Sequence, residues 1–317
     1  MKKCDIAVIG CGPAGLTAAV YAIRAGYSAA LYEGNAPGGQ MLLAHEIENY
    51  SGFSKISGME LADAMTEQAA ALGAEFVYAS VESISFDESF YTVTAGGESL
   101  AYRAVIVASG TERRLLQVPG ESEFAGRGVS YCAVCDGRFF KDKDVAVIGG
   151  GNTAIGDALY LARICRSVTL VHRRDSFRAD RILVERLAEH TNIRTVMNAR
   201  VERIEGGERV ESLILTGTVE GHLSAPMVLP VNGIFVAVGS KPQLSFFMDM
   251  DKLSMDAGGY LVTDERCRTS LPGLFAAGDV RAKPLRQIAT AVSDGAVAAV
   301  EAVEYLESQK KNGGVSV

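Results

Sequence analysis

The chain has 317 residues, of which 48% are hydrophobic and 22% charged, and its formal net charge is −7. This length is typical of about two domains, each with enough apolar residues to fill a core. The negative charge argues against nucleic acid or an anionic membrane surface as partner. Because no run of about 18 or more apolar residues occurs, no membrane span is expected. The first predicted strand begins close to Met1 and leaves no room for a signal peptide, so a cytoplasmic protein is expected.

The chain contains a duplication. Residues 5–34 read DIAVIGCGPAGLTAAVYAIRAGYSAALYEG, and residues 144–173 read DVAVIGGGNTAIGDALYLARICRSVTLVHR. The two segments align without a gap. Each predicts a buried strand, a glycine-rich turn, a helix and a second strand, which is the unit that cradles the pyrophosphate of a dinucleotide.

The first copy predicts a strand at Ile6–Ile9, a helix at Ala14–Ala25 and a strand at Ala29–Glu33. Its turn supplies the candidate nucleotide contacts Gly10, Gly12, Pro13, Ala14 and Gly15. The acid Glu33, at the end of the second strand, suits a free ribose diol. The alternative is a tight turn in an α/β domain that binds nothing.

The segment between the copies predicts a loop, an amphipathic helix, antiparallel strands, a buried strand and a crossover loop. In chain order these occupy Asn35–Gln40, Gly58–Leu72, Glu75–Ala95 with Glu98–Ala101, Ala104–Ala108, and Leu115–Gly128. The periodicity of the apolar residues and the positions of glycine and proline carry these assignments.

The second copy ends in a basic cluster where the first ends in an acid. His172, Arg173 and Arg174, followed by Arg178, suit a 2′-phosphate because a guanidinium binds phosphate with two hydrogen bonds. The turn of this copy supplies the candidate contacts Gly149, Gly151, Asn152 and Thr153. The alternative is a solvated basic strand end. The sequence therefore predicts two different dinucleotides on one chain.

Between the two copies lies Cys132-Ala133-Val134-Cys135-Asp136. A zinc site would need two further ligands at suitable spacing, and the sequence offers none, so no metal is expected. Two buried structural thiols are possible, but this spacing favours a redox dithiol with one thiol of lowered pKa. We expect Ser130 to cap a short helix there. Asp136 is either a surface acid or the proton donor to the leaving thiolate.

The C-terminal part predicts a closing strand at Gly233–Val238, a strand at Leu274–Ala277 that runs into Gly278-Asp279, and a long helix at Gln287–Leu306. With these segments, the two nucleotide units and the dithiol, the chain closely resembles a low-molecular-weight, bacterial-type thioredoxin reductase over nearly its whole length. The His-Arg-Arg pattern of that family selects NADPH over NADH.

The resemblance implies an α/β fold with two Rossmann-like dinucleotide-binding domains. An FAD-binding domain would comprise residues 1–114 and 244–317, with an NADPH-binding domain, residues 115–243, inserted between its halves. The two crossings, at 112–116 and 241–245, would form a hinge. Thioredoxin or a thioredoxin-like protein is the implied partner, and a homodimer the implied assembly.

The resemblance also assigns roles to single residues. Cys135 would face the flavin, and Cys132 would attack the disulfide of the partner. The implied electron path runs from NADPH to FAD, then to the Cys132–Cys135 disulfide, then to the partner. Further implied flavin contacts are Gly39, Gln40, Asn49, Gly110, Gly278, Asp279, Arg286, Gln287 and Ile288.

Three other functions compete with this interpretation. A small-molecule dithiol oxidase would not need the basic cluster. A ferredoxin–NADP reductase of the same fold would not need the dithiol. A flavin-loaded redox sensor without turnover is compatible with every motif, and rapid NADPH consumption with a disulfide acceptor would exclude it.

Overall fold

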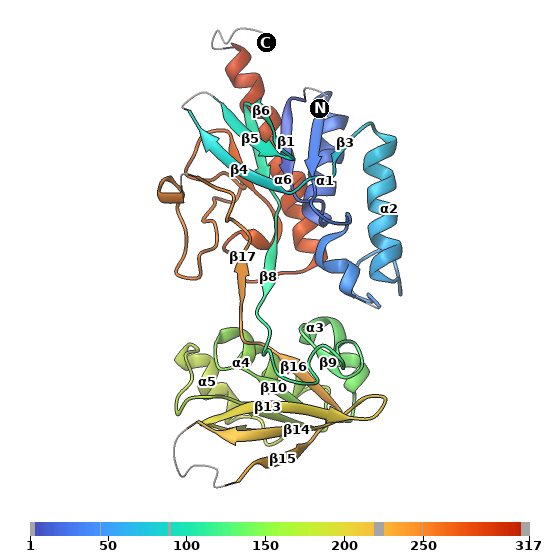
Figure 1. The fold of residues 1–317 in the computed structure, drawn as a ribbon, viewed down its shortest axis with the longest axis vertical. Coiled ribbons are helices and arrows are strands. Elements are labelled where there is room, and N and C mark those ends of the chain that lie inside the picture. The colour runs from blue at the N-terminus through green and yellow to red at the C-terminus, as the bar shows by residue number, and fades with distance from the viewer. Residues whose placement is uncertain (1–3, 45, 88–89, 219–224, 249, 312–317) are drawn as a thin grey trace. The chain divides into compact units, whose positions relative to one another are not determined.

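The computed structural model describes residues 4–44, 46–87, 90–218, 225–248 and 250–311 (Figure 1). The chain forms two compact units. Unit 1 contains Met1–Glu112 and Lys241–Val317, and unit 2 contains the segment Arg113–Ser240. Unit 2 is therefore an insertion into unit 1, and the chain passes between the units twice.

Unit 1 is built on a parallel sheet with the strand order β18-β7-β1-β2-β3. Its strands are β1 (Ile6–Ile9), β2 (Ala29–Tyr32), β3 (Glu75–Val77), β7 (Ala104–Val107) and β18 (Leu274–Ala276). The central strands are buried along their full length, as expected when both faces of a sheet are covered. A separate antiparallel sheet contains β4 (Val81–Phe86), β5 (Tyr91–Ala95) and β6 (Glu98–Tyr102).

The helices of unit 1 begin and pack for identifiable reasons. They are α1 (Pro13–Arg24), α2 (Gly58–Ala71) and α6 (Ile288–Lys311), with the 3-10 helices η1 (Gly39–Leu43), η3 (Met250–Lys252) and η4 (Gly278–Val280). α2 begins with a capping box, because Ser57 accepts the N–H of Glu60 and the Glu60 carboxylate accepts the N–H of Ser57. α1 and α6 approach closely at Gly295, where a Cβ would lie 2.2 Å from the carbonyl oxygen of Ala14.

Unit 2 has a parallel sheet with the strand order β12-β11-β10-β16-β9. Its strands are β9 (Val129–Ser130), β10 (Asp144–Ile148), β11 (Ser167–Val171), β12 (Ile193–Val196) and β16 (Gly233–Val236). An antiparallel sheet contains β13 (Ala199–Gly206), β14 (Val210–Gly217) and β15 (Met227–Pro230). The helices are α3 (Ala133–Asp136), α4 (Asn152–Leu161) and α5 (Arg181–Leu187), with the 3-10 helix η2 (Gly137–Phe140).

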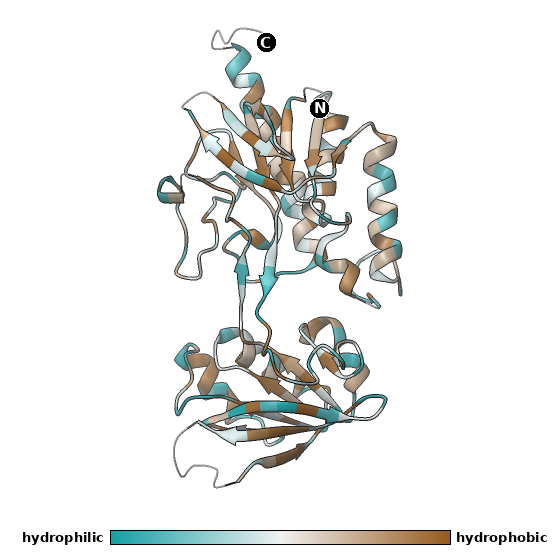
Figure 2. Cartoon of the chain, in the orientation of Figure 1, coloured by the Kyte–Doolittle hydropathy of each residue, from teal (hydrophilic) through white to brown (hydrophobic). Residues whose placement is uncertain are grey.

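The duplication seen in the sequence extends to the strand order of both units. β10, β11, β12 and β16 take the places in unit 2 that β1, β2, β3 and β7 take in unit 1. In each unit the antiparallel sheet is inserted in the chain between the third and fourth of these strands. Each unit has its own apolar core, to which both strands and helices contribute (Figure 2). The predicted α/β class with two Rossmann-like sheets is confirmed.

The two passages between the units run side by side. β8 (Thr111–Arg113) and β17 (Ser240–Pro242) form a small two-stranded sheet (Figure 1). At one end the N–H of Arg114 donates to the carbonyl of Gly239 at 3.0 Å, and at the other Gln243 donates to Gly110 at 3.1 Å. The linker is therefore a paired ribbon rather than two independent loops.

The structure corrects several expectations about the elements. The first part of Glu75–Ala95 is β3, which pairs in parallel with β2 in the main sheet and not in an antiparallel sheet. This strand is short and half-buried, so its alternation could not reveal its partner. Gly39 and Gln40, expected in a loop, begin η1. The helices and strands between residues 175 and 232, α5 and β12–β15, were not predicted.

None of the helices in the described part of the chain combines the length and the apolar composition that a transmembrane span requires.

Candidate active site

The first glycine of each nucleotide turn is packed against the sheet. Gly10 has φ +104° and Gly149 has φ +154°. A Cβ at Gly10 would lie 2.5 Å from the carbonyl oxygen of Ala108, and one at Gly149 would lie 2.3 Å from that of Ala237. Gly15 is equally confined, because its Cβ would lie 1.9 Å from the carbonyl oxygen of Gly10. Gly10 and Gly149 therefore require glycine for both conformation and space, and Gly15 requires it for space.

The second glycine of each turn faces open space. A Cβ at Gly12 or Gly151 would meet no described atom within 4 Å. Each glycine is the N-cap residue of the following helix, α1 or α4, and no described side chain caps that helix. Free backbone N–H groups at the positive end of a helix dipole bind phosphate. Each turn therefore offers a cradle that fits a pyrophosphate and that a side chain would fill.

Unit 1 gathers several predicted flavin contacts around its turn. A Cβ at Gly39 would lie 3.2 Å from the Cα of Gly12, and one at Gly278 would lie 2.9 Å from the Cβ of Ala14. Pro13 occupies the first position of α1. The beginnings of α1, η1 and η4 therefore meet at one place, although they are far apart in the sequence.

Glu33 lies at the same edge of the sheet. Its Oε2 accepts the N–H of Cys11 at 3.0 Å, and its Oε1 accepts the N–H of Asn35 at 3.0 Å. The carboxylate is thus fixed at the carboxyl ends of β1 and β2, where parallel α/β sheets bind ligands. It remains able to accept further hydrogen bonds, such as those from ribose hydroxyls.

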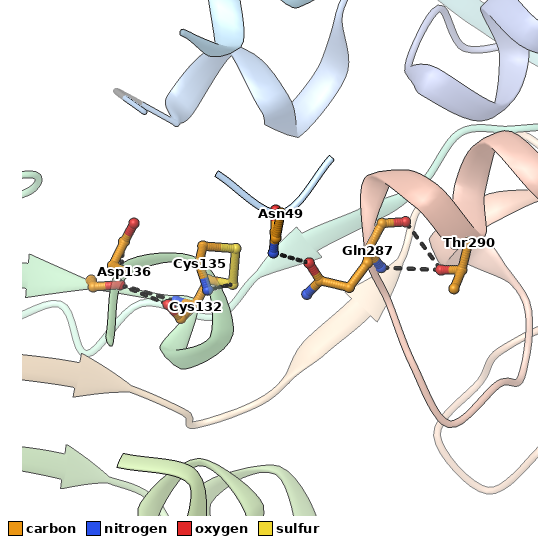
Figure 3. The surroundings of a disulfide bond; sticks show 7 residues. Asn49, Cys132, Cys135, Asp136, Gln287 and Thr290 are labelled. Atoms are coloured by element: carbon orange, nitrogen blue, oxygen red, sulfur yellow. Dashed lines mark hydrogen bonds between the residues drawn. A yellow bond between two sulfur atoms is a disulfide. The ribbon is translucent and has the colours of Figure 1, made fainter. Parts of the chain in front are cut away.

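Side-chain hydrogen bonds connect other predicted flavin contacts of unit 1. Gln40 donates to the carbonyl of Thr111 at 2.6 Å and to its hydroxyl at 2.9 Å. Asn49 donates to the Oε1 of Gln287 at 3.1 Å (Figure 3). Gln287 immediately precedes Ile288, the first residue of α6, and its N–H donates to the hydroxyl of Thr290.

Two further predicted contacts lie beside the linker and beside η4. Gly110 has φ +67° and precedes β8. Arg286 places its guanidinium carbon 4.0 Å from the centroid of the Tyr260 ring and donates from Nε to the carbonyl of Asp279 at 3.2 Å. The Arg286 side chain therefore supports the backbone of Asp279.

Sequence reasoning missed Asp294, which organises the turn at Gly278. Its carboxylate accepts the N–H of Gly278 at 3.1 Å, Nη1 of Arg281 at 2.8 Å and Nζ of Lys283 at 2.7 Å. A carboxylate that binds two cations and a backbone N–H fixes the segment they belong to. The signal in the sequence is an acid beside Gly295 on a stretch of α6 rich in alanine and valine.

In unit 2 the basic cluster folds back onto the second turn. The His172 ring covers Gly150, where a Cβ would lie 2.3 Å from the ring. The N–H of Arg178 donates to the carbonyl of Gly150 at 2.7 Å. Burial lowers the pKa of His172, and the neighbouring arginines lower it further. At neutral pH the positive charge is therefore carried by the exposed Arg173, Arg174 and Arg178.

Asn152 fastens the segment after this cluster to the turn. Its Nδ2 donates to the Oδ2 of Asp180 at 2.8 Å, and its Oδ1 accepts the N–H of Asp180 at 2.8 Å. Thr153, the next residue of α4, is exposed. The predicted contacts of the second copy thus surround a single turn.

Cys132 and Cys135 form a disulfide at the start of α3, with their Cα atoms 5.3 Å apart (Figure 3). Cys132 is the N-cap residue, and its Sγ accepts the N–H of Cys135 at 3.2 Å. The prediction that Ser130 caps this helix was wrong, because Ser130 ends β9 two residues earlier. Its hydroxyl instead accepts the N–H of Cys132 at 3.1 Å and donates to Oδ2 of Asp136 at 2.6 Å.

Asp136 is a half-buried carboxyl group directly beside the disulfide. Burial raises its pKa above the ordinary value, while the Ser130 hydroxyl and the charge of Arg113 act in the opposite direction. A carboxyl whose pKa is raised retains a proton at higher pH and is better suited to protonate a leaving thiolate.

The other cysteines are buried thiols: Cys4, Cys11, Cys165 and Cys267. Burial raises the pKa of Cys165 and of Cys267 to about 11 and also raises that of Cys11. The thiols of Cys11, Cys165 and Cys267 are therefore protonated and unreactive at neutral pH. The described residues contain no group of three or more side chains suited to holding a metal ion.

Comparison with known proteins places this geometry in context. Residues 4–295 match the family model described as pyridine nucleotide-disulphide oxidoreductase. A thioredoxin reductase of Listeria innocua is 46% identical over 311 residues, which cover 98% of this chain and 96% of the relative. The crystal structure of thioredoxin reductase from Streptococcus pyogenes superposes with a TM-score of 0.88 at 42% identity, covering 96% of this chain and 98% of that one. A thioredoxin reductase from Giardia duodenalis gives 0.91 at 34% identity, covering 97% and 100%.

Proposed function

This chain belongs to the pyridine nucleotide-disulphide oxidoreductase family and, within it, to the thioredoxin reductases, and we propose that it reduces the disulfide of thioredoxin with NADPH through FAD. The observation that carries this proposal is the Cys132–Cys135 disulfide beside Asp136, in a unit that also has a nucleotide turn flanked by arginines. A second nucleotide turn, closed by an acid, lies in the other unit.

FAD fits unit 1. The open space at Gly12, bounded by Gly39, would accept the pyrophosphate, and Glu33 would accept hydrogen bonds from the adenosine ribose. Asp279 would bind the ribitol chain, and Asn49, Gln287 and the start of α6 would lie along the flavin. The chemistry that FAD supplies when bound is the transfer of an electron pair from a nicotinamide to a disulfide.

NADPH fits unit 2. Gly151 would accept its pyrophosphate, and Arg173, Arg174 and Arg178 would bind its 2′-phosphate. NADH lacks this phosphate, so it would leave the arginine cluster without a partner. The preference for NADPH therefore follows from electrostatics and from bidentate hydrogen bonding.

The dithiol performs the last step by thiol–disulfide exchange. The Cys132 thiolate would attack one sulfur of the thioredoxin disulfide, forming a mixed disulfide and expelling the other sulfur as a thiolate. Asp136 would give its proton to that thiolate. Cys135 would then attack Cys132, which restores the disulfide of this chain and releases reduced thioredoxin. An electron pair and two protons pass to the partner in total.

The first test is the anaerobic addition of NADPH, and separately of NADH, to the purified flavoprotein, followed by flavin absorbance. Bleaching by NADPH at low concentration, followed by reoxidation with oxidised thioredoxin, supports the proposal. Cys132→Ser should abolish the reoxidation and retain the bleaching. Absence of bleaching by either nucleotide overturns the proposal and favours a ferredoxin-fed enzyme or an oxidase.

A homodimer, a cytoplasmic location and a rotation of unit 2 about the linker stay predictions. The paired strands β8 and β17 support the rotation, because a short ribbon can change direction without breaking the cores of the units. A rotation would let a flavin meet the nicotinamide and the dithiol in turn.

A further inference from the structure

Tyr131, which immediately precedes the dithiol, has a role that neither the motifs nor the proposed function assigns. The guanidinium carbon of Arg113 lies 5.4 Å from the centroid of its ring, within the range of a cation–π contact. Its hydroxyl donates to Oε1 of Glu121 at 3.2 Å. Tyr131 therefore has a cation on its face and a carboxylate at its tip.

Glu121 fixes the chain where it leaves the linker. It is only 3% exposed, and it accepts the N–H of Leu116 at 2.9 Å and that of Gln117 at 2.7 Å. Gln117 has φ +59°, a backbone conformation that residues other than glycine rarely adopt. The Glu121 carboxylate thus holds a strained segment in place, four residues beyond Arg113.

Arg113 is the last residue of β8 and the first residue of unit 2. Burial and the Glu121 carboxylate raise the pKa of Tyr131 to about 12, so its hydroxyl remains a hydrogen-bond donor throughout the physiological range. Titration of Tyr131 therefore does not break its contact with Glu121 near neutral pH. The contact between Arg113 and Tyr131 joins β8 to the residue that precedes Cys132.

We propose that Tyr131 and Glu121 are positioning residues that hold the Arg113 guanidinium beside the dithiol, so that the linker strand supplies a fixed positive charge to the site of thiol–disulfide exchange. This inference rests on the proposed function, because the proton of Asp136 matters only if the dithiol exchanges with a partner.

The groups that face Asp136 support this role. Ser130, on β9, donates to it, and Arg113, on β8, is the cation that lowers its pKa against the effect of burial. α4 packs against the end of α3, because a Cβ at Gly137 would lie 3.0 Å from Leu161 and 3.2 Å from Tyr160, and Asp157 lies one turn earlier on α4. Arg113 is therefore the positive charge that opposes burial at this site.

The decisive variant is Arg113→Met, which keeps an unbranched side chain close to the length of the aliphatic part of arginine and removes its charge. Asp136 must be protonated to donate, so the rate of thioredoxin reduction should fall as pH rises through its pKa. Loss of the nearby cation should move this falling limb to higher pH by about half a unit. Tyr131→Phe, which keeps the ring and loses the tether to Glu121, should move it by a smaller amount in the same direction.

A matched control is Arg127→Met, because Arg127 makes a similar contact in unit 2, 5.8 Å from the centroid of the Phe124 ring. It should leave the pH profile unchanged. If the Arg113→Met and Tyr131→Phe profiles coincide with that of the parent, the proposal is overturned. A shift in Arg127→Met equal to that in Arg113→Met would overturn it as well, since a general loss of positive charge would then explain the result.

A second readout does not depend on turnover. The chemically reduced holoenzyme is treated with iodoacetamide at pH 7, and alkylation of Cys132 is followed by mass spectrometry. Loss of the Arg113 cation should slow this alkylation about threefold, because the thiolate loses a stabilising charge. An unchanged rate contradicts the proposal. If alkylation is slowed in Arg113→Met but the parent protein never reduces thioredoxin, the proposed function is refuted, and the effect of the Arg113 charge on the dithiol is retained.

Discussion

At the scale of single residues, the described part of unit 2 contains two carboxyl groups whose pKa is raised by burial. Asp136 lies beside the disulfide, and a hydroxyl and a cation partly offset the effect of burial there. For Asp157, on α4, burial alone raises the pKa to about 7. The surroundings of the two groups differ: Asp136 has a hydroxyl and a cation beside it, whereas Asp157 loses solvation without a compensating charge.

Asp136→Asn should reduce the rate of thioredoxin reduction about 100-fold or more, the usual contribution of a positioned general acid. The bleaching of the flavin by NADPH should be unaffected, because that step precedes thiol exchange. Stopped-flow measurements of the two half-reactions distinguish these effects. The falling limb of the pH profile should also disappear, because asparagine does not titrate. Equal rates of thioredoxin reduction in the variant and the parent would remove Asp136 from the mechanism.

Asp157→Asn should stabilise the protein at high pH. Because the pKa of Asp157 rises from 3.8 to about 7 on folding, its favourable contribution is complete below pH 3.8 and is lost as pH rises through 7. Three pKa units correspond to at most about 4 kcal/mol. The variant should therefore match the parent in thermal unfolding at pH 4 and unfold several degrees higher at pH 8. Exposed Asp251→Asn is the control, and a variant less stable than the parent at pH 8 would contradict this account.

At the scale of elements, glycines decide how closely helices approach their neighbours. Gly295 lies inside α6 against the backbone of Ala14, next to the turn that would hold the flavin pyrophosphate. Gly156 lies inside α4, and a Cβ there would meet no described atom within 4 Å. Both glycines lie inside a helix, but a methyl group would clash with a neighbouring backbone at Gly295 and would meet open space at Gly156.

Gly295→Ala should destabilise unit 1 and weaken FAD binding, because α1 and α6 must separate to admit a methyl group. We expect a loss of about 1–3 kcal/mol in the free energy of unfolding. Gly156→Ala should instead stabilise α4 by about 0.5–1 kcal/mol, since alanine is the better helix former. Urea denaturation and FAD release, followed by flavin fluorescence, measure both effects. A neutral Gly295→Ala would mean that the helices can separate at little cost.

The elements that the sequence predicted well are those with a local signature. β1 has the predicted bounds, and the turns at Gly10 and Gly149 have the predicted strand before and helix after. β3 was assigned to the wrong sheet because its partner β2 lies more than forty residues earlier in the chain. The role of Asp294 was missed because its partners Gly278, Arg281 and Lys283, 11 to 16 residues earlier in the chain, are brought to it only by folding.

At the scale of the whole molecule, duplication followed by divergence explains two sites of opposite charge on one architecture. The strand order is the same in both units, so the difference lies in the residues at the end of the second strand: Glu33 in one, and the cluster from His172 to Arg178 in the other. Strand order follows from the repeat, which the sequence reveals. Contacts such as Arg113 with Tyr131 depend on the linker, which has no counterpart in the repeat.

Because unit 2 is one continuous segment with its own core, residues 113–240 should fold alone. Its two ends are adjacent, since the N–H of Arg114 donates to the carbonyl of Gly239.

Isothermal titration of this segment should show binding of 2′,5′-ADP and much weaker binding of 5′-AMP, because only the former presents a 2′-phosphate to the arginines. Arg173→Gln with Arg174→Gln should abolish this preference, while Arg200→Gln with Arg203→Gln, on β13, should preserve it. An unfolded segment would show that unit 2 needs unit 1 for stability, and a folded segment that binds both nucleotides equally would refute the assignment of the 2′-phosphate site.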